Sequence, residues 1–148
     1  MKKIIFVFLM AILVSCIPNQ EQAKELKAPI DELVANWQNN WNNHDSVGVR
    51  NMFLEDALLI ENEIICRNAD EFAAKWIHPN IRGVHRLETH KLQEWSTTER
   101  AGYTGTYSVE VIHDSVPEYP KGAFTVNWIK TENNEWKITS AVIHAFNP

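Results

Sequence analysis

The stretch WNNHDSVGVRNMFLEDALLIEN, from Trp41 to Asn62, predicts the end of one helix, a short second helix and the entry into a strand. Asp45 directly precedes SVGVRNMF, where a carboxylate can accept a hydrogen bond from a free N–H group of the first helical turn. The apolar run ALLIE, from Ala57 to Glu61, has the length and composition of a strand. The stretch therefore predicts a change from helical to extended structure within a few residues.

The helix that ends in this stretch is predicted from apolar residues that recur every three or four positions. Pro29 suits its first turn, because proline has no N–H group to leave unpaired there. One face of the helix then carries the apolar side chains toward the core, including both tryptophans of the segment WQNNWNNHD. This stripe consists of Ile30, Leu33, Val34, Trp37 and Trp41.

A third helix and four strands are predicted downstream. Asn68, followed three residues later by Glu71, matches the capping box, and the helix that it starts is expected to end near Trp76. From Val84 onward the apolar period changes to two, and the turn sequences TTER, SVPEYPKG and ENN separate the segments. The predicted strands span residues 84–95, 100–113, 122–131 and 135–146.

Helices followed by long consecutive strands predict an α+β fold, with the helices on one face of a curved, mostly antiparallel sheet. This order, together with Trp41–Asn62 and the ending NEWKITSAVIHAF (Asn134–Phe146), resembles the nuclear transport factor 2-like superfamily, which includes SnoaL-like cyclases and ketosteroid isomerases. The resemblance covers about residues 30–146. It implies a cone in which three N-terminal helices pack on the sheet, and in which the first helix closes the opening over a pocket. These signatures describe a fold and specify no reaction.

The N-terminal sequence MKKIIFVFLMAILVSC has the organisation of a bacterial lipoprotein signal peptide. Its apolar run is shorter than the roughly 20 residues of a membrane-spanning helix, and LVSC resembles the lipobox, whose cysteine is lipidated. The expected organisation is a signal peptide (1–15), lipidated Cys16 with a polar tether (16–29), and one domain (30–148). A plain signal peptide is the alternative. Lipidation of Cys16 anchors a domain to a membrane, here in the bacterial cell envelope, with the periplasmic side and the cell surface both left open.

Composition excludes several classes of function. The chain has 14 basic and 19 acidic residues, a formal net charge of −5, which disfavours nucleic acid as a partner. It contains no glycine-rich phosphate loop and no nucleophile elbow. With Cys16 acylated, Cys66 has no cysteine to pair with. The histidines do not follow metal-ligand spacing, so neither a metal nor a cofactor is expected.

The resemblance implies which side chains line the pocket. Glu61 falls where ketosteroid isomerases carry a general-base carboxylate, and Trp37 falls where they carry a tyrosine donor to the oxyanion. Asn127 falls where they carry a protonated aspartic acid, and His144 at a pocket position of the last strand. Trp41 lies one helical turn after Trp37, on the same stripe. The oxyanion donors are therefore altered at two positions, which disfavours steroid isomerisation.

Each of these residues also has a purely structural interpretation. The two tryptophans fit a helix core, and Glu61 can end its strand in solvent or pair with Arg67. Asn127 can satisfy backbone groups, and His144 can be a hydrogen-bonded core histidine.

Two classes of function remain. The favoured one is a binding module that holds a small, largely apolar molecule in its cone. The alternative is an enzyme of isomerase or dehydratase type that uses Glu61 or His85 as acid or base, because His85 begins its strand as a histidine does in the scytalone dehydratase branch. Asn42 stands where that branch has an aspartate, so the dehydratase pair is incomplete.

A homodimer is also expected. Phe124, Val126 and Trp128 alternate with Asn127, so that an inward Asn127 would leave an apolar outer face for a second copy to bury. In relatives the outer sheet face is the dimer interface. Two further aromatic residues face either the pocket or this interface, according to register: Tyr103 and Tyr107.

Overall fold

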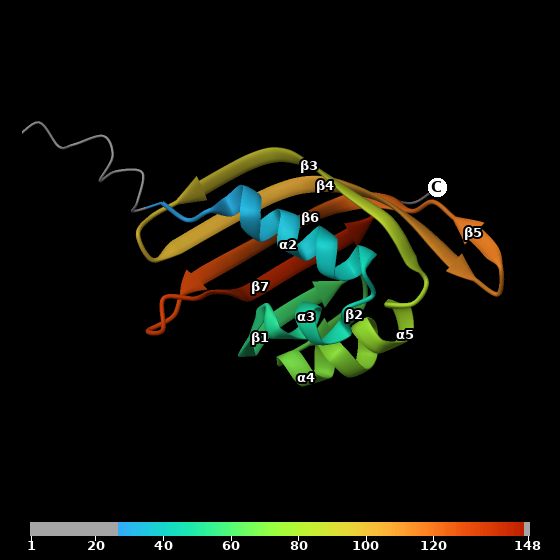
Figure 1. Cartoon of the computed structure of the whole chain (residues 1–148), viewed down its shortest axis with the longest axis horizontal. Coiled ribbons are helices and arrows are strands. Elements are labelled where there is room, and N and C mark those ends of the chain that lie inside the picture. Colours follow the sequence, from blue (N-terminus) through green and yellow to red (C-terminus); the bar gives the residue numbers. More distant parts are fainter. Residues whose placement is uncertain (1–26, 147–148) are drawn as a thin grey trace, which may run out of the picture.

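The computed structural model describes residues 27–146. The predicted signal peptide, Cys16 and most of the tether lie outside the described residues. Five helical segments and seven strands are present in these residues (Figure 1). The three predicted helices and five predicted strands occur in the expected order, and two short strands, Ile64–Cys66 and Val116–Glu118, are additional. The helical segments are α2 (Ile30–Asn42), α3 (Ser46–Asn51), α4 (Ala69–Phe72), the π-helix η1 (Ala73–Ile77) and α5 (His78–Asn80).

One curved sheet holds all the strands, and the predicted α+β fold is confirmed. Its strand order is β2-β1-β7-β6-β4-β3, with β5 paired to β4. Among the described strands, only β1 and β7 run parallel, and the other pairs are antiparallel. The strands are β1 (Phe53–Glu61), β2 (Ile64–Cys66), β3 (Val84–Ser96), β4 (Arg100–His113), β5 (Val116–Glu118), β6 (Lys121–Lys130) and β7 (Trp136–Ala145).

Helix α2 lies across the concave face of the sheet (Figure 1). Its apolar stripe is covered there, and Trp41 is only 1% exposed. Burial of one large apolar side chain contributes roughly 1.5–3 kcal/mol to stability. The carboxamide of Asn42 adds a polar attachment at the end of the helix, because it accepts a hydrogen bond from the Leu87 N–H (2.7 Å) and donates one to the Leu87 carbonyl (3.1 Å). The packing and this attachment place the helix over the inner face of the sheet.

The predicted cap of the second helix is confirmed. The Asp45 carboxylate accepts a hydrogen bond of 2.8 Å from the Gly48 N–H, and α3 begins directly after it. The helix ends at Asn51 rather than continuing through Phe53, which is the first residue of β1.

The third helix begins as predicted but runs further. Asn68 caps it by accepting a hydrogen bond of 2.8 Å from the Glu71 N–H, whereas the Glu71 carboxylate accepts one from the Arg67 N–H (3.2 Å). The expected end near Trp76 is wrong, because η1 and α5 carry the chain onward. Pro79 is tolerated there because it lies in the first turn of α5, where a missing N–H costs no internal hydrogen bond.

Strand β6 presents the opposite face from the one expected. Val126 (5% exposed) and Trp128 (3% exposed) face inward and line a small apolar void with Val34. Asn127 faces outward, and its amide donates a hydrogen bond to the Ser140 hydroxyl (3.1 Å). The interpretation of Phe124, Val126 and Trp128 as an outer dimer face is therefore wrong. Alternation alone identifies two faces, and only packing under α2 decides which one is covered.

The pairing of β4 with β6 also decides which face of the sheet the two tyrosines of β4 occupy. Tyr103 is buried and packs against the ring of Phe124 at 5.4 Å between centroids. Tyr107 pairs with Gly122 of β6, and its ring occupies the space in which any side chain at that glycine would lie. Both rings are therefore on the inner face of the sheet.

Candidate functional site

A cavity of about 240 Å³ lies between α2, the segment η1–α5 and the inner face of the sheet. The helix contributes two tryptophans, and β1, β4 and β7 contribute side chains from their ends. Most lining groups are apolar, which is typical of small-molecule sites in which a few polar groups set orientation. The apolar side chains include Val84, Leu87, Val109, Val111, Phe124 and Ile143.

Three tryptophans form one wall of this cavity. Trp41 is central, with ring centroids 5.8 Å from Trp37 and 4.8 Å from Trp76, both in edge-to-face geometry. Such pairs add about 0.5–1.5 kcal/mol each beyond the burial of their area. Trp37 and Trp76 are partly exposed at the edges of the cluster, whereas Trp41 is fully enclosed. The two tryptophans of the segment WQNNWNNHD are therefore core and cavity wall at once.

Glu61 is the ionisable group of β1 that faces the cavity. It ends the strand, opposite Ile143 of β7, and is half-buried. Burial raises the pKa of the Glu61 carboxyl, because removal from water disfavours the charged form.

Asn62 positions this carboxyl. The Ala145 N–H donates to the Asn62 carbonyl oxygen Oδ1 (3.1 Å), so the amide nitrogen Nδ2 must point the other way, where it donates to Glu61 Oε1 at 2.6 Å. The backbone of Asn62 has φ = 48°, a left-handed conformation that asparagine adopts more readily than most residues. Glu61 is therefore held through one oxygen, and Oε2 makes no hydrogen bond within the described residues.

Tyr107 is the second polar group of the inner wall. Burial raises the pKa of its hydroxyl, and the negative charge of Glu61 raises it further. Gly122 is required beneath it, since a Cβ atom there would collide with the tyrosine ring and with the His144 carbonyl. A neutral hydroxyl and a carboxyl thus share one end of the cavity.

The structure brings together three of the five predicted pocket residues: Trp37, Trp41 and Glu61 all line the cavity. Asn127 and His144 do not line it, which corrects the expectation for both. His144 is exposed because its neighbours Ile143 and Ala145 are the inward residues of β7, and successive side chains point to opposite faces.

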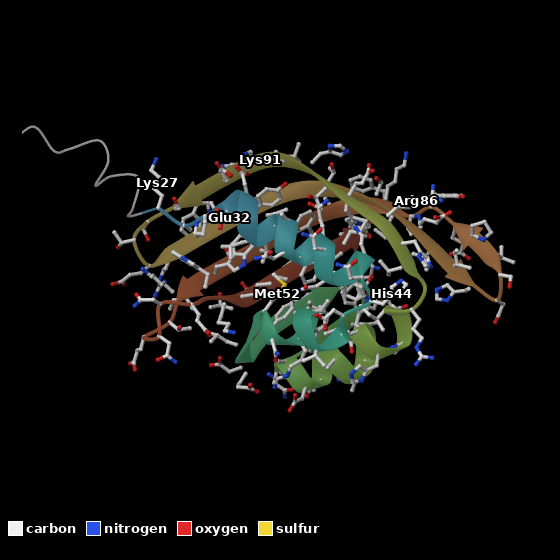
Figure 2. All side chains as sticks on the ribbon, viewed as in Figure 1. Lys27, Glu32, His44, Met52, Arg86 and Lys91 are labelled. Carbon is white, nitrogen blue, oxygen red and sulfur yellow. The ribbon has the colours of Figure 1, made fainter. Side chains whose placement is uncertain are left out.

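His85, the alternative acid or base, is also absent from the cavity lining. Its ring packs edge to face against His44, 4.9 Å away between centroids. Figure 2 shows His44 at the C-terminal end of α2, where its Nε2 lies 3.0 Å from the Val84 carbonyl. His85 therefore belongs to the contact between α2 and β3.

Several lining residues were not anticipated from the sequence. The sequence predicts Trp76 only as a residue near the end of a helix, and its ring reaches the cavity because η1 packs beside Trp41. Thr89, His113 and Glu118 supply polar groups, the last two from the β4–β5 hairpin. A period-two count could have placed His113 on the face of Tyr107, but nothing local indicates that this hairpin closes a cavity.

The described residues contain no group of three or more histidine, cysteine, aspartate or glutamate side chains placed to hold a metal ion. Between residues 27 and 146, no helix has the length and apolar character needed to cross a membrane.

Comparison with known proteins gives a likeness of structure. No family model matches the chain, and no curated protein matches it. A ketosteroid isomerase-like protein from Erwinia carotovora atroseptica superposes with a TM-score of 0.70 at 12% identity, covering 80% of this chain and 95% of that one. A nuclear transport factor 2-like superfamily protein from Salmonella enterica serovar Typhimurium gives 0.71 at 11% identity, with coverage of 88% and 95%.

The chain has the nuclear transport factor 2-like fold. An NTF-2 like protein of unknown function from Shewanella oneidensis MR-1 agrees, with a TM-score of 0.67 at 19% identity and coverage of 83% and 98%. Identities at this level establish the nuclear transport factor 2-like fold and leave the chemistry to the residues of the site.

Proposed function

We propose that the domain binds a small, largely apolar molecule in the cavity beneath α2, with Glu61 as its polar anchor. The observation that carries this proposal is the lining itself, a tryptophan wall and aliphatic strand residues around one positioned carboxyl. Burial of apolar surface supplies the affinity, and the carboxyl sets the orientation of the ligand.

The test is direct detection of a ligand and of its dependence on the site. Native mass spectrometry of the purified protein should show a retained small molecule, and its loss should change tryptophan fluorescence because Trp37 and Trp41 form the wall. Glu61→Gln should weaken retention, whereas Glu63→Gln, an exposed carboxylate two residues away, should leave it unchanged. If both variants retain the ligand equally well, Glu61 is not the polar anchor.

A second candidate function is catalysis with Glu61 as acid or base. The raised pKa of this carboxyl and its hydrogen bond from Asn62 favour it, because a general base needs a pKa near the working pH and a fixed position. Tyr107 offers a hydroxyl in place of the missing donor at Asn127. If this function holds, Glu61→Gln should abolish turnover without loss of affinity; loss of affinity alone would favour binding.

Membrane anchoring through Cys16 is a further part of the proposal, based on LVSC directly after the apolar run. Cys16→Ser should leave an uncleaved precursor that no longer incorporates a fatty-acid analogue. Labelling that persists in this variant would contradict a lipoprotein of the cell envelope.

The proposed partner in assembly is a second copy, on the outer sheet face. Leu58, Ile65 and Val142 are exposed there and surround Ile60, which pairs with both neighbouring strands. These residues replace the buried β6 series as the candidate interface. Val142→Glu should shift a dimer to monomer in sedimentation, and a wild type that is monomeric at micromolar concentration would refute the homodimer.

A further inference from the structure

The cavity combines aromatic rings with negative charge. Its aromatic lining comes from three different layers, namely α2, η1 and the inner sheet. Glu61 lies inside it and Glu118 at its exposed end. Within the described residues, no lysine or arginine lines the cavity. The aromatic rings belong to Trp37, Trp41, Trp76, Tyr107 and Phe124.

Aromatic rings together with carboxylates favour one ligand charge over the others. The face of an aromatic ring carries partial negative charge and attracts a cation placed over it, most strongly for tryptophan. A neutral apolar ligand would remove water from Glu61 without giving the carboxylate a partner, which is costly. An anionic ligand would add repulsion from Glu61. A cationic ligand gives the desolvated Glu61 carboxylate a partner and replaces repulsion with attraction.

We infer that the molecule bound in this cavity is an organic cation, a protonated amine or quaternary ammonium group carried on an apolar body. The inference rests on the proposed function, since it names the class of ligand for the same site. Asn62 occupies Oε1 of Glu61, and Oε2 accepts no hydrogen bond from residues 27–146, so Oε2 is available to the cationic head. The tryptophan wall and the aliphatic side chains of β4 contact the body.

The other titratable groups on the cavity agree with this assignment. Burial and the negative charge of Glu61 raise the pKa of Tyr107 above its ordinary value, so its hydroxyl keeps its proton and adds no charge of its own to the cavity. His113 is exposed at the end of β4, beside the hairpin that carries Glu118. Glu118 adds negative charge at the opening, where it raises the local concentration of a positively charged ligand.

The experiment compares three probes with one ring and different charge: cyclohexylmethylamine, cyclohexylmethanol and cyclohexanecarboxylate. Each is titrated into the purified protein, with tryptophan fluorescence as the readout. The amine should bind at least about tenfold more tightly than the alcohol, because a desolvated carboxylate and aromatic faces favour the cation. The carboxylate should bind most weakly.

Glu61→Gln keeps the shape of the side chain and removes its charge. In this variant the amine should fall to the affinity of the alcohol, while the alcohol should bind no less tightly than before. Glu63→Gln is the matched control, because it removes an equal charge outside the cavity and should preserve the tenfold preference.

The outcomes separate this inference from the proposed function. If the alcohol or the carboxylate binds wild type as tightly as the amine, the cavity binds small molecules and the cationic class is wrong. If none of the probes binds at millimolar concentration and native mass spectrometry finds no ligand, both are wrong. The wild-type comparison decides this even if a variant fails to fold.

Discussion

The two ends of strand β1 each carry a carboxylate, and their surroundings are opposite. Glu55, at the start, is exposed and forms a bidentate ion pair with Arg50 (2.8 and 2.6 Å), which also contacts Asp70 (2.8 Å). The hydrogen bond from Arg50 lowers the pKa of Glu55. Glu61, at the end, faces the cavity, and burial raises its pKa. One strand thus holds a carboxylate satisfied by the fold and another that is open to a ligand.

The two carboxylates differ in whether a cationic side chain of the protein pairs with them. Arg50 draws α3, β1 and α4 together at an exposed corner, and exposed pairs of this kind contribute little to stability. Glu61 receives an amide from Asn62 but no cation from the described residues. The Arg50 ion pairs connect elements of the fold, whereas the Glu61 carboxylate can still pair with a bound ligand.

The largest expected effect comes from breaking the wall beside Glu61. Trp41→Ala should lower the free energy of unfolding by about 3–5 kcal/mol, because it empties the centre of the tryptophan cluster. Chemical denaturation measures it. Trp95→Ala is the control, since Trp95 is half-exposed on the outer face, and it should cost about 1 kcal/mol or less. Equal losses would mean that the cluster is not part of the core.

A smaller effect is expected at the exposed corner. Asp45→Ala removes the cap of α3, the helix that carries Arg50, and should cost about 1 kcal/mol. Binding in the cavity should stay unchanged, because Asp45 does not line it. A thermal melt and a titration with cyclohexylmethylamine check both parts. Weakened binding would show that the two corners are coupled.

Asn62→Asp sharpens the comparison at the cavity end. An aspartate can keep φ = 48° and still accept from the Ala145 N–H, but it replaces the amide donor to Glu61 with a second carboxylate. The pKa of Glu61 should rise further, and stability should fall by about 1 kcal/mol. NMR titration of the Glu61 carboxyl measures the shift. Asn134→Asp, also at positive φ but in the β6–β7 turn, should leave that pKa unchanged.

The smallest expected effects are changes of stability with pH, and they are opposite in sign for Glu55 and Glu61. The lowered pKa of Glu55 means that its stabilisation is present above the ordinary carboxyl value and is lost as pH falls through the folded-state pKa. The raised pKa of Glu61 means that charging it disfavours the fold, so this penalty disappears as pH falls from 7 toward the ordinary carboxyl value. Wild type should therefore lose stability relative to Glu55→Gln and gain it relative to Glu61→Gln on acidification. Urea unfolding from pH 7 down to about pH 3, below the ordinary carboxyl value, measures both effects, and stability shifts of equal sign would contradict the opposite surroundings of the two carboxylates.

Part of the candidate site was predictable from local pattern. Trp37 and Trp41 follow from helical spacing, and Glu61 follows from the end of an apolar strand combined with the resemblance to the fold. Trp76 and Glu118 were not predictable in this way, because they reach the cavity only when η1 and the β4–β5 hairpin close over the sheet. The role of Asn62 is not predictable from local sequence, because it depends on Ala145, which lies far away in the sequence.

The sequence by itself determined where the three helices begin, the long strands, the caps at Asp45 and Asn68, and the α+β class. Caps and periodicity act between residues a few positions apart, so they can be read from the sequence without any long-range contact. Only the tertiary structure decided that Phe124, Val126 and Trp128 face inward while Asn127 faces outward. A strand has two faces of identical backbone chemistry, and the choice between them is made by the helix that packs on one of them and excludes water from it.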